Sequence, residues 1–286
     1  MKVLKSLITA LLISVSAVVL AAAAGSRDKK NSNDKITVIV RESGSGTRSA
    51  FTELFAVSDE TVPNSAKTET DTGKVLAAVA ADESAVGYIS LGSLDKSVRA
   101  VTIDGAPSSA ATVKNGTYRI SRPFSLIVKT TAENSLTADF IRFVLSETGQ
   151  TLIAQNGYIA AVKNPAYIAT AKSGKITIDG STSVFPIMEK LAGAYRELNS
   201  DTDVKVLQSD SSLGIQRAVQ GTVDIGTASR TITDTEKSTG IECTVFALDG
   251  IAVIVNKKNP VRNLSSEQVR AIYTGRITAW SELIDN

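Results

Sequence analysis

Three segments of this chain share one pattern, in which a strand-like run rich in β-branched residues leads into a short loop of Ser, Thr and Gly that opens a helical run. The three loops occupy residues 41–47, 179–183 and 208–214. Strand-like and helical runs also alternate elsewhere between Ile36 and Tyr273, and such alternation is typical of layered α/β structure. We therefore expect an α/β fold in which these loops lie at the starts of helices.

Loops of this composition are suited to holding a small oxyanion. Helix starts present free N–H groups and the positive end of the helix dipole, glycine permits close approach, and hydroxyls add donors. Arg41, beside the first loop, would add a guanidinium that binds two oxygens at once. Because Ser, Thr and Gly are also ordinary cap and turn residues, one such loop would indicate only a helix start, but three loops with an adjoining arginine favour an anion site.

The N-terminus has the pattern of a secretory signal peptide. Two lysines precede an apolar run from Leu7 to Leu20, and small residues follow. We expect residues 1–24 to be the signal and residues 25–34 to be a disordered tail before the fold. The alternative is an uncleaved membrane anchor, but the run is short for a span and lacks a basic flank.

The cysteine content also bears on the compartment. Cys243 is the single cysteine, so no internal disulfide forms and no lipoprotein cysteine stands at the cleavage point. The sequence therefore predicts a protein released into the periplasm or the extracellular space rather than a lipid-anchored one.

Composition argues against several classes of function. The chain contains no histidine, which excludes Ser-His-Asp and Cys-His catalysis and zinc sites built on histidine. Its formal net charge is +2, and Lys2 and Lys5 of the signal carry that excess, so the mature chain is close to neutral. A neutral chain argues against nucleic acid or an anionic membrane as partner. We expect no enzyme activity, no metal site and no cofactor.

The segments around the loops resemble those of the phosphate-binding proteins that serve ABC-type phosphate importers, a family of two-lobed periplasmic binding proteins. The most specific similarity is the Arg-x-Ser-Gly-Ser-Gly-Thr loop at residues 41–47. Other similar segments are spread along nearly the whole mature chain and lie at residues 86–92, 179–184, 211–215 and 221–230. The resemblance implies a type II-like fold of two mixed α/β lobes joined by a two-strand hinge. It also implies a monomer that captures inorganic phosphate and delivers it to a membrane permease.

The order of these segments differs from the family's usual order. Family members begin with the Gly-Ser-Thr-Ser segment and reach the arginine loop later, whereas here the arginine loop comes first. We therefore interpret the chain as circularly permuted, with a linker at about 163–174 that joins the former termini. By analogy, one lobe comprises residues 35–115 and 249–286, and the other comprises residues 116–248.

The resemblance assigns phosphate contacts to both lobes. The first lobe would supply Arg41, Ser45, Gly46 and Thr47, and the second would supply Thr182, Ser183, the Val184 backbone, Ser211 and Ser229. Some family members have an aspartate where Ser229 stands. A carboxylate accepts the proton that phosphate keeps at neutral pH and that sulfate lacks. Because Ser229 can also donate, the sequence leaves selectivity between phosphate and sulfate open.

Three alternatives remain from the sequence. The first is a binding protein for another tetrahedral oxyanion such as sulfate. The second is a phosphoester hydrolase, which would need a nucleophile with a base or metal ligands. The third is a surface protein that has the fold without binding. Among nearby residues, we expect Asp179, Asp210 and Asp224 to act in caps or turns, Arg230 to pair with a carboxylate, and Trp280 to pack at a lobe surface.

Overall fold

The computed structural model describes residues 34–131, 134–170 and 172–283. Every element below belongs to the unit Lys35–Asn286. The predicted signal peptide and nearly all of the predicted tail lie outside the described residues. Within the described ranges, no helix is long and apolar enough to cross a membrane.

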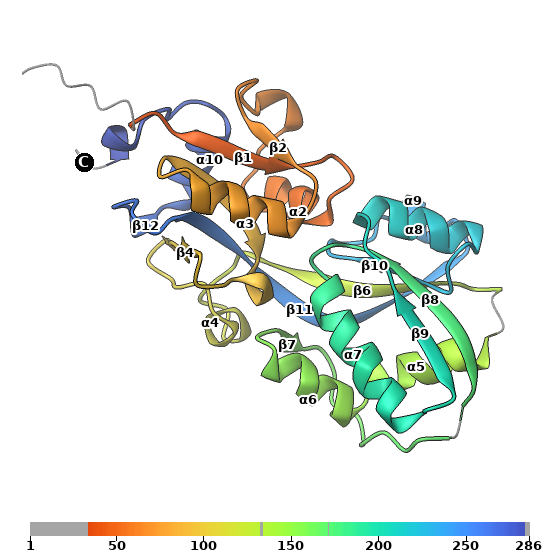
Figure 1. The fold of residues 1–286 in the computed structure, drawn as a ribbon. Helices are drawn as coiled ribbons and strands as arrows, with labels where there is room; N and C mark the ends of the chain where they lie inside the picture. The colour runs from red at the N-terminus through yellow and green to blue at the C-terminus, as the bar shows by residue number, and fades with distance from the viewer. Residues whose placement is uncertain (1–33, 132–133, 171, 284–286) are drawn as a thin grey trace, which may run out of the picture. The chain divides into compact units, whose positions relative to one another are not determined.

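A ten-stranded mixed sheet organises the fold (Figure 1). Its main path runs β2-β1-β3-β11-β6-β10-β8-β9, and β4 and β7 pair with β11 beside this path. The strands are β1 Thr37–Arg41, β2 Lys67–Glu69, β3 Ala85–Ser90, β4 Val98–Ala100, β6 Ser121–Lys129, β7 Ile159–Ala160, β8 Gly174–Gly180, β9 Thr202–Val206, β10 Ile225–Ala228 and β11 Ile241–Asn256. A separate parallel pair is formed by β5 Thr102–Ile103 and β12 Asn263–Leu264.

Helices cover the sheet, and most begin at a polar side chain that caps the first turn. They are α2 Gly46–Leu54, α3 Thr72–Ala81, α4 Ala110–Lys114, α5 Ser135–Leu145, α6 Glu147–Gln155, α7 Phe185–Leu198, α8 Ser211–Gln220, α9 Asp234–Lys237 and α10 Ser266–Tyr273. Short 3₁₀ turns are η1 Asp59–Thr61, η2 Leu91–Ser93 and η3 Trp280–Leu283. Ser45, Asp71 and Asp210 accept a hydrogen bond from a first-turn N–H of α2, α3 and α8. Such capping satisfies a donor that has no partner inside the helix.

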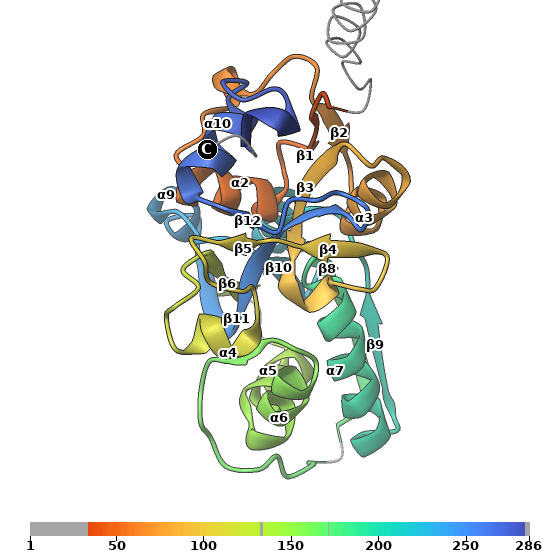
Figure 2. The same ribbon diagram turned by 90° about the vertical axis from the view of Figure 1, so that its left-hand side faces the viewer.

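The described residues form four hydrophobic clusters, and β11 contributes side chains to each of them. Lobe A denotes the half with β1 to β4, α2, α3 and α10, and lobe B the half with β6, β8, β9, β10 and α5 to α8. Core side chains of lobe A include Phe51, Tyr88, Val253 and Ile272, and those of lobe B include Phe124, Phe143, Ile178 and Leu191. Figure 2 shows lobe A above and lobe B below, with β6 and β11 between them. The predicted α/β class is confirmed, whereas the lobe boundaries remain predictions.

The strand β11 passes from one lobe to the other. Its first part, Ile241–Gly250, pairs antiparallel with β6, and its second part, Ile251–Val255, pairs antiparallel with β3. Both parts belong to one continuous strand. The join includes Asp249, whose buried carboxylate pairs with Arg122 at 3.1 Å. Pairing offsets part of the cost of burying these two charges.

The chain between β7 and β8 contains neither helix nor strand at residues 161–170 and 172–173. Tyr167 in this segment packs edge-on against Phe143 with ring centres 5.2 Å apart, and its hydroxyl donates to Asp139. The segment is therefore packed along lobe B.

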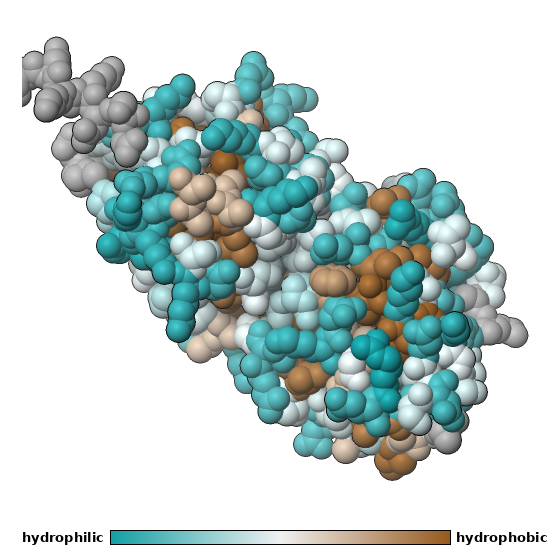
Figure 3. All heavy atoms as spheres, in the orientation of Figure 1, coloured by the Kyte–Doolittle hydropathy of each residue, from teal (hydrophilic) through white to brown (hydrophobic). Residues whose placement is uncertain are grey.

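On the face drawn in Figure 3, hydrophobic residues gather over β8 and β9 of this lobe.

Candidate functional site

The predicted loops lie where lobe A approaches lobe B. Arg41 is the last residue of β1, and the loop after it leads into α2. Residues 181–184 connect β8 to α7, and Asp210 is the N-cap of α8. Each loop leads into a helix, as the sequence predicted, but α2 begins at Gly46 and α8 at Ser211, so the last residues of the predicted loops 41–47 and 208–214 are already helical.

Polar contacts cross directly from lobe A to lobe B. Arg41 Nη2 donates to Thr182 Oγ1 at 3.1 Å. Thr47 Oγ1 and Ser183 Oγ lie 2.8 Å apart. All four side chains are buried, so the contact excludes solvent. The structure therefore brings these predicted residues together in one cluster.

The lobes approach each other closely at Gly46. A Cβ atom added there would lie 2.3 Å from Ser211 Oγ and 2.8 Å from Ser229 Oγ. Ser211 and Ser229 are fully buried, and the Ser229 N–H donates to Ser211 Oγ at 3.1 Å. Only a residue without a side chain permits this approach, which is the physical reason for glycine here.

Arg41 is the cation of the cluster, and a carboxylate balances its charge. Arg41 Nε and Nη2 donate to Glu42 Oε2 and Oε1 at 2.9 and 2.7 Å, a bidentate pair. The backbone N–H of Arg41 donates to the Tyr88 hydroxyl at 3.1 Å, and burial raises the pKa of Tyr88 to about 12. Tyr88 is therefore neutral at physiological pH. The cluster offers an anion many donors at little net charge.

Helix starts supply further donors. As the first residues of α2, Gly46 and Thr47 have N–H groups without an intrahelical acceptor, and the helix dipole favours an anion there. Ser45 Oγ accepts from the Arg48 N–H at 3.3 Å, which leaves its own proton available for donation. The Val184 N–H, by contrast, donates to the Ser181 carbonyl at 3.0 Å. The Val184 backbone, a predicted contact, is thus already bonded within its own loop.

Ser181 is a buried site residue that the sequence analysis missed. The Ser183 N–H donates to Ser181 Oγ at 3.2 Å, and Ser181 Oγ donates to Ser229 Oγ at 2.8 Å. Ser181 Oγ therefore accepts from Ser183 and uses its single proton towards Ser229. Ser229 accepts from Ser181 and retains a proton to donate. The position of Ser181 inside the predicted loop 179–183 was the feature that could have found it.

The three acidic residues near the loops have structural roles. Asp210 is the N-cap of α8, which confirms the expected capping role. Asp224 accepts from the Thr177 N–H at 2.8 Å, and Asp179 forms an ion pair with Arg217. Each carboxylate is thus engaged within lobe B.

Arg230 behaves as expected from the sequence, whereas Trp280 lies in the hydrophobic core of lobe A rather than at a lobe surface. Arg230 forms a bidentate pair with Glu236 at 2.8 and 2.7 Å. Trp280 is buried, and its indole N–H donates to the Ser84 carbonyl at 3.0 Å. Neither side chain makes a hydrogen bond with the cluster in the described structure.

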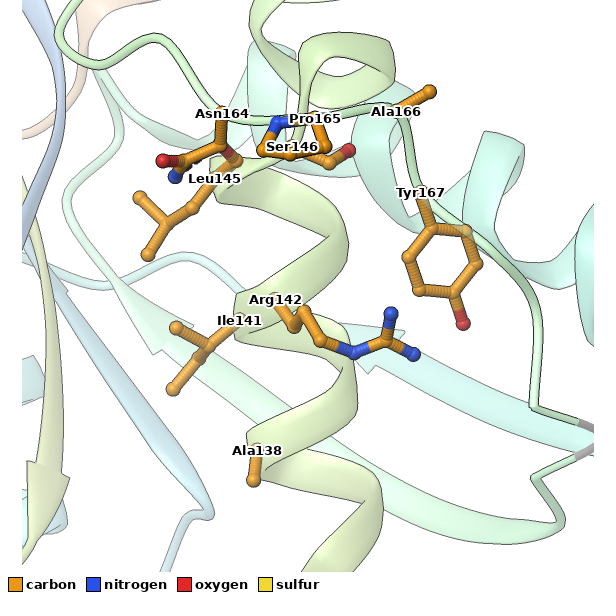
Figure 4. Close-up of a pocket in the computed structure, with 9 residues that line it drawn as sticks. All are labelled: Ala138, Ile141, Arg142, Leu145, Ser146, Asn164, Pro165, Ala166 and Tyr167. Carbon is orange, nitrogen blue, oxygen red and sulfur yellow. Dashed lines mark hydrogen bonds between the residues drawn. The ribbon is translucent and has the colours of Figure 1, made fainter.

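A pocket of about 510 Å³ lies apart from this cluster, on the outer side of α5 (Figure 4). Its lining consists of Ala138, Ile141, Arg142, Leu145, Ser146, Asn164, Pro165, Ala166 and Tyr167. Arg142 pairs with Asp139, and its guanidinium lies 4.6 Å from the centre of the Tyr167 ring. Because this cation is already paired and the lining is largely apolar, the pocket is a poor site for an anion.

The fold and the cluster define a two-lobed binding protein, and comparison with known proteins gives the same class. A family model described as the PBP superfamily domain matches residues 15–148 and 165–286. The chain therefore belongs to the PBP superfamily.

Relatives with higher sequence identity identify the family within this superfamily. The chain is 45% identical over 270 residues to the phosphate-binding protein PstS 2 of Streptococcus agalactiae, covering 91% of this chain and 92% of that one. It is 39% identical over 263 residues to PstS 2 of Streptococcus pneumoniae, covering 89% and 90%. It also matches the crystal structure of a phosphate ABC transporter, phosphate-binding protein from S. pneumoniae with a TM-score of 0.70 at 39% identity, covering 87% and 99%. The chain belongs to the PstS family of phosphate-binding proteins, which confirms the predicted family.

The predicted circular permutation is not confirmed. The alignments to the two PstS 2 proteins run through about nine-tenths of both chains. The order of segments found here is therefore shared with these streptococcal relatives. Permutation relative to other members of the family stays a prediction.

Proposed function

We propose that this chain is an exported binding protein that captures inorganic phosphate and delivers it to the membrane permease of an ABC importer. One observation carries the proposal: Arg41 and hydroxyl-bearing loops from both lobes converge in a single buried cluster. The names of the PstS relatives support phosphate as the ligand.

In the proposed complex, the phosphate oxygens receive hydrogen bonds from both lobes. Arg41 supplies the formal cation, and helix starts and hydroxyls supply neutral donors. The proposed contacts are Arg41, Ser45, Gly46, Thr47, Thr182, Ser183, Ser211 and Ser229. Val184 would join them if its N–H turned from the Ser181 carbonyl to the anion. No covalent step is involved, and the relatives are named as binding proteins rather than enzymes.

Closure of the lobes is part of this proposal. Residues 35–115 with 249–286 would move as one lobe and residues 116–248 as the other, with β11 and the chain entering β6 as the hinge. The cross-lobe contacts at Arg41 and Thr47 would form only in the closed state, which the permease would recognise. The protein would act as a monomer in the periplasm or outside the cell.

Sulfate is the second candidate ligand, and one observation favours it. Ser229 accepts from Ser181 and keeps a proton to donate, so it offers an oxyanion a donor. A carboxylate acceptor would favour a protonated phosphate and repel sulfate, and the hydroxyl chain supplies no such repulsion.

Calorimetric titration of the ligand-stripped mature chain tests the proposal. We expect phosphate to bind, and Arg41→Ala to weaken binding about 100-fold, because hydrogen bonds to charged groups are worth more than neutral ones. Arg276→Ala is the matched control, since Arg276 pairs on the surface with Glu267. An absence of heat from phosphate, or tighter binding of sulfate, would overturn the assignment. Turnover in a phosphatase assay would overturn the assignment as a binding protein.

A further inference from the structure

Thr72 lies at the edge of the cluster, on a helix that the sequence analysis did not connect with binding. It is the first residue of α3 in lobe A and is 6% exposed. A threonine at a helix start ordinarily serves as a cap, but here Asp71 accepts from the Lys74 N–H at 2.8 Å and fills that role. The hydroxyl of Thr72 is therefore available for another purpose.

The hydroxyl of Thr72 faces three groups of the cluster. Its Oγ1 lies 3.4 Å from Thr182 Oγ1, 3.5 Å from Ser183 Oγ and 3.5 Å from Arg41 Nη1. These separations are at the long limit of hydrogen bonds, so the hydrogen bonds among these groups are weak. One acceptor atom placed between the hydroxyls and the guanidinium could accept hydrogen bonds from all of them.

We propose that Thr72 is a further ligand of the bound oxyanion, and that α3 is a further helix whose N-terminus faces it. The inference rests on the proposed function above. An anion oxygen bound by Arg41 Nη1 and Thr182 Oγ1 would also lie near Thr72 Oγ1. The first N–H groups of α3, at Thr72 and Gly73, lack intrahelical acceptors and carry the positive end of the helix dipole.

Thr72 also joins the lobes. It belongs to lobe A, whereas Thr182 and Ser183 belong to lobe B, so these contacts require the lobes to be together. A ligand oxygen at this point would strengthen contact across the junction. Thr72 would then contribute to affinity through the closed state.

Thr137 provides a matched control. It is also a threonine in the first turn of a helix, α5, and is likewise 6% exposed. Asn134 caps that helix, and Thr137 Oγ1 makes no hydrogen bond with any described residue. Replacing either threonine by valine removes one buried hydroxyl and keeps the shape of the side chain.

The experiment titrates inorganic phosphate into the mature chain and into Thr72→Val, Thr72→Ser and Thr137→Val. We expect Thr72→Val to weaken phosphate binding about tenfold, from the loss of one hydrogen bond to a charged group. Thr72→Ser and Thr137→Val should bind within about twofold of the parent. The melting temperature without phosphate should stay unchanged in Thr72→Val, because the effect lies in the ligand contact. If valine prevents folding, Thr72→Ala serves in its place.

Three outcomes would overturn this inference. If Thr72→Val binds phosphate as the parent does while Arg41→Ala does not bind, Thr72 is no ligand and the proposed function stands. If the parent binds no phosphate, the proposed function and this inference fail together. Equal weakening in Thr72→Val and Thr72→Ser would show that packing, and not the hydroxyl, is responsible, and would also overturn it.

Discussion

Replacing Gly46 by alanine should weaken closure of the lobes on phosphate without destabilising the folded protein. Gly46 opens α2 and is not among the glycines with positive φ, so its backbone accepts an alanine. An added Cβ would lie 2.3 Å from Ser211 Oγ and 3.0 Å from Ser211 Cβ, where ordinary contacts begin near 3.4 Å. Ser211 is at the start of α8 in lobe B. The clash is therefore confined to the state in which the lobes meet.

The size of the effect follows from that geometry. Overpacking a tight interface by one methyl group costs about 1 to 3 kcal/mol. That cost falls on the closed, ligand-bound state, so phosphate affinity should drop by roughly 5-fold to 150-fold. Stability without ligand should be unchanged or slightly higher, because alanine favours a helix over glycine.

Calorimetry with phosphate measures the affinity, and thermal unfolding without phosphate measures the stability. Gly193→Ala on α7 is the matched control, because the nearest heavy atom to its added Cβ, on Arg196, is 3.9 Å away. It should leave affinity unchanged and stabilise the protein by about 0.5 to 1 kcal/mol. If Gly46→Ala bound phosphate within twofold of the parent, the reasoning about closure would be refuted.

Two further predictions concern ion pairs. Asp249→Asn should cost about 3 to 5 kcal/mol in urea unfolding, because it leaves the buried Arg122 cation unpaired, and replacing both residues by apolar ones should recover most of the loss. A cost below about 1 kcal/mol would contradict this. The hydrogen bond from Arg230 lowers the pKa of Glu236 from 4.5 to about 2, so the pair stabilises the fold above pH 4.5 and loses its effect as pH falls towards 2. Glu236→Gln should reduce the loss of unfolding free energy at acidic pH by about 1 to 2 kcal/mol, after allowance for solvent screening. Glu189→Gln, at an exposed position of α7, should leave that loss unchanged.

Local features of the fold could be predicted from the sequence alone. The loops 41–47 and 179–183 could be predicted because caps and turns depend on a few neighbouring residues. The same holds for the roles of Asp210 and Arg230, whose partners lie within six residues along the chain. Helix α3 was not singled out, because its mainly alanine and valine sequence shows little contrast between its faces.

The tertiary structure decided how these local pieces meet. Gly46 must be a glycine because Ser211 and Ser229 of the other lobe approach it, and that approach cannot be read from the loop itself. Thr72 and Thr182 are 110 residues apart in the chain, so only folding could place their hydroxyls together. Sequence thus determined which loops begin helices and carry donors, through interactions between near neighbours. Packing of the two lobes determined which donors share one site, because that depends on contacts between distant parts of the chain.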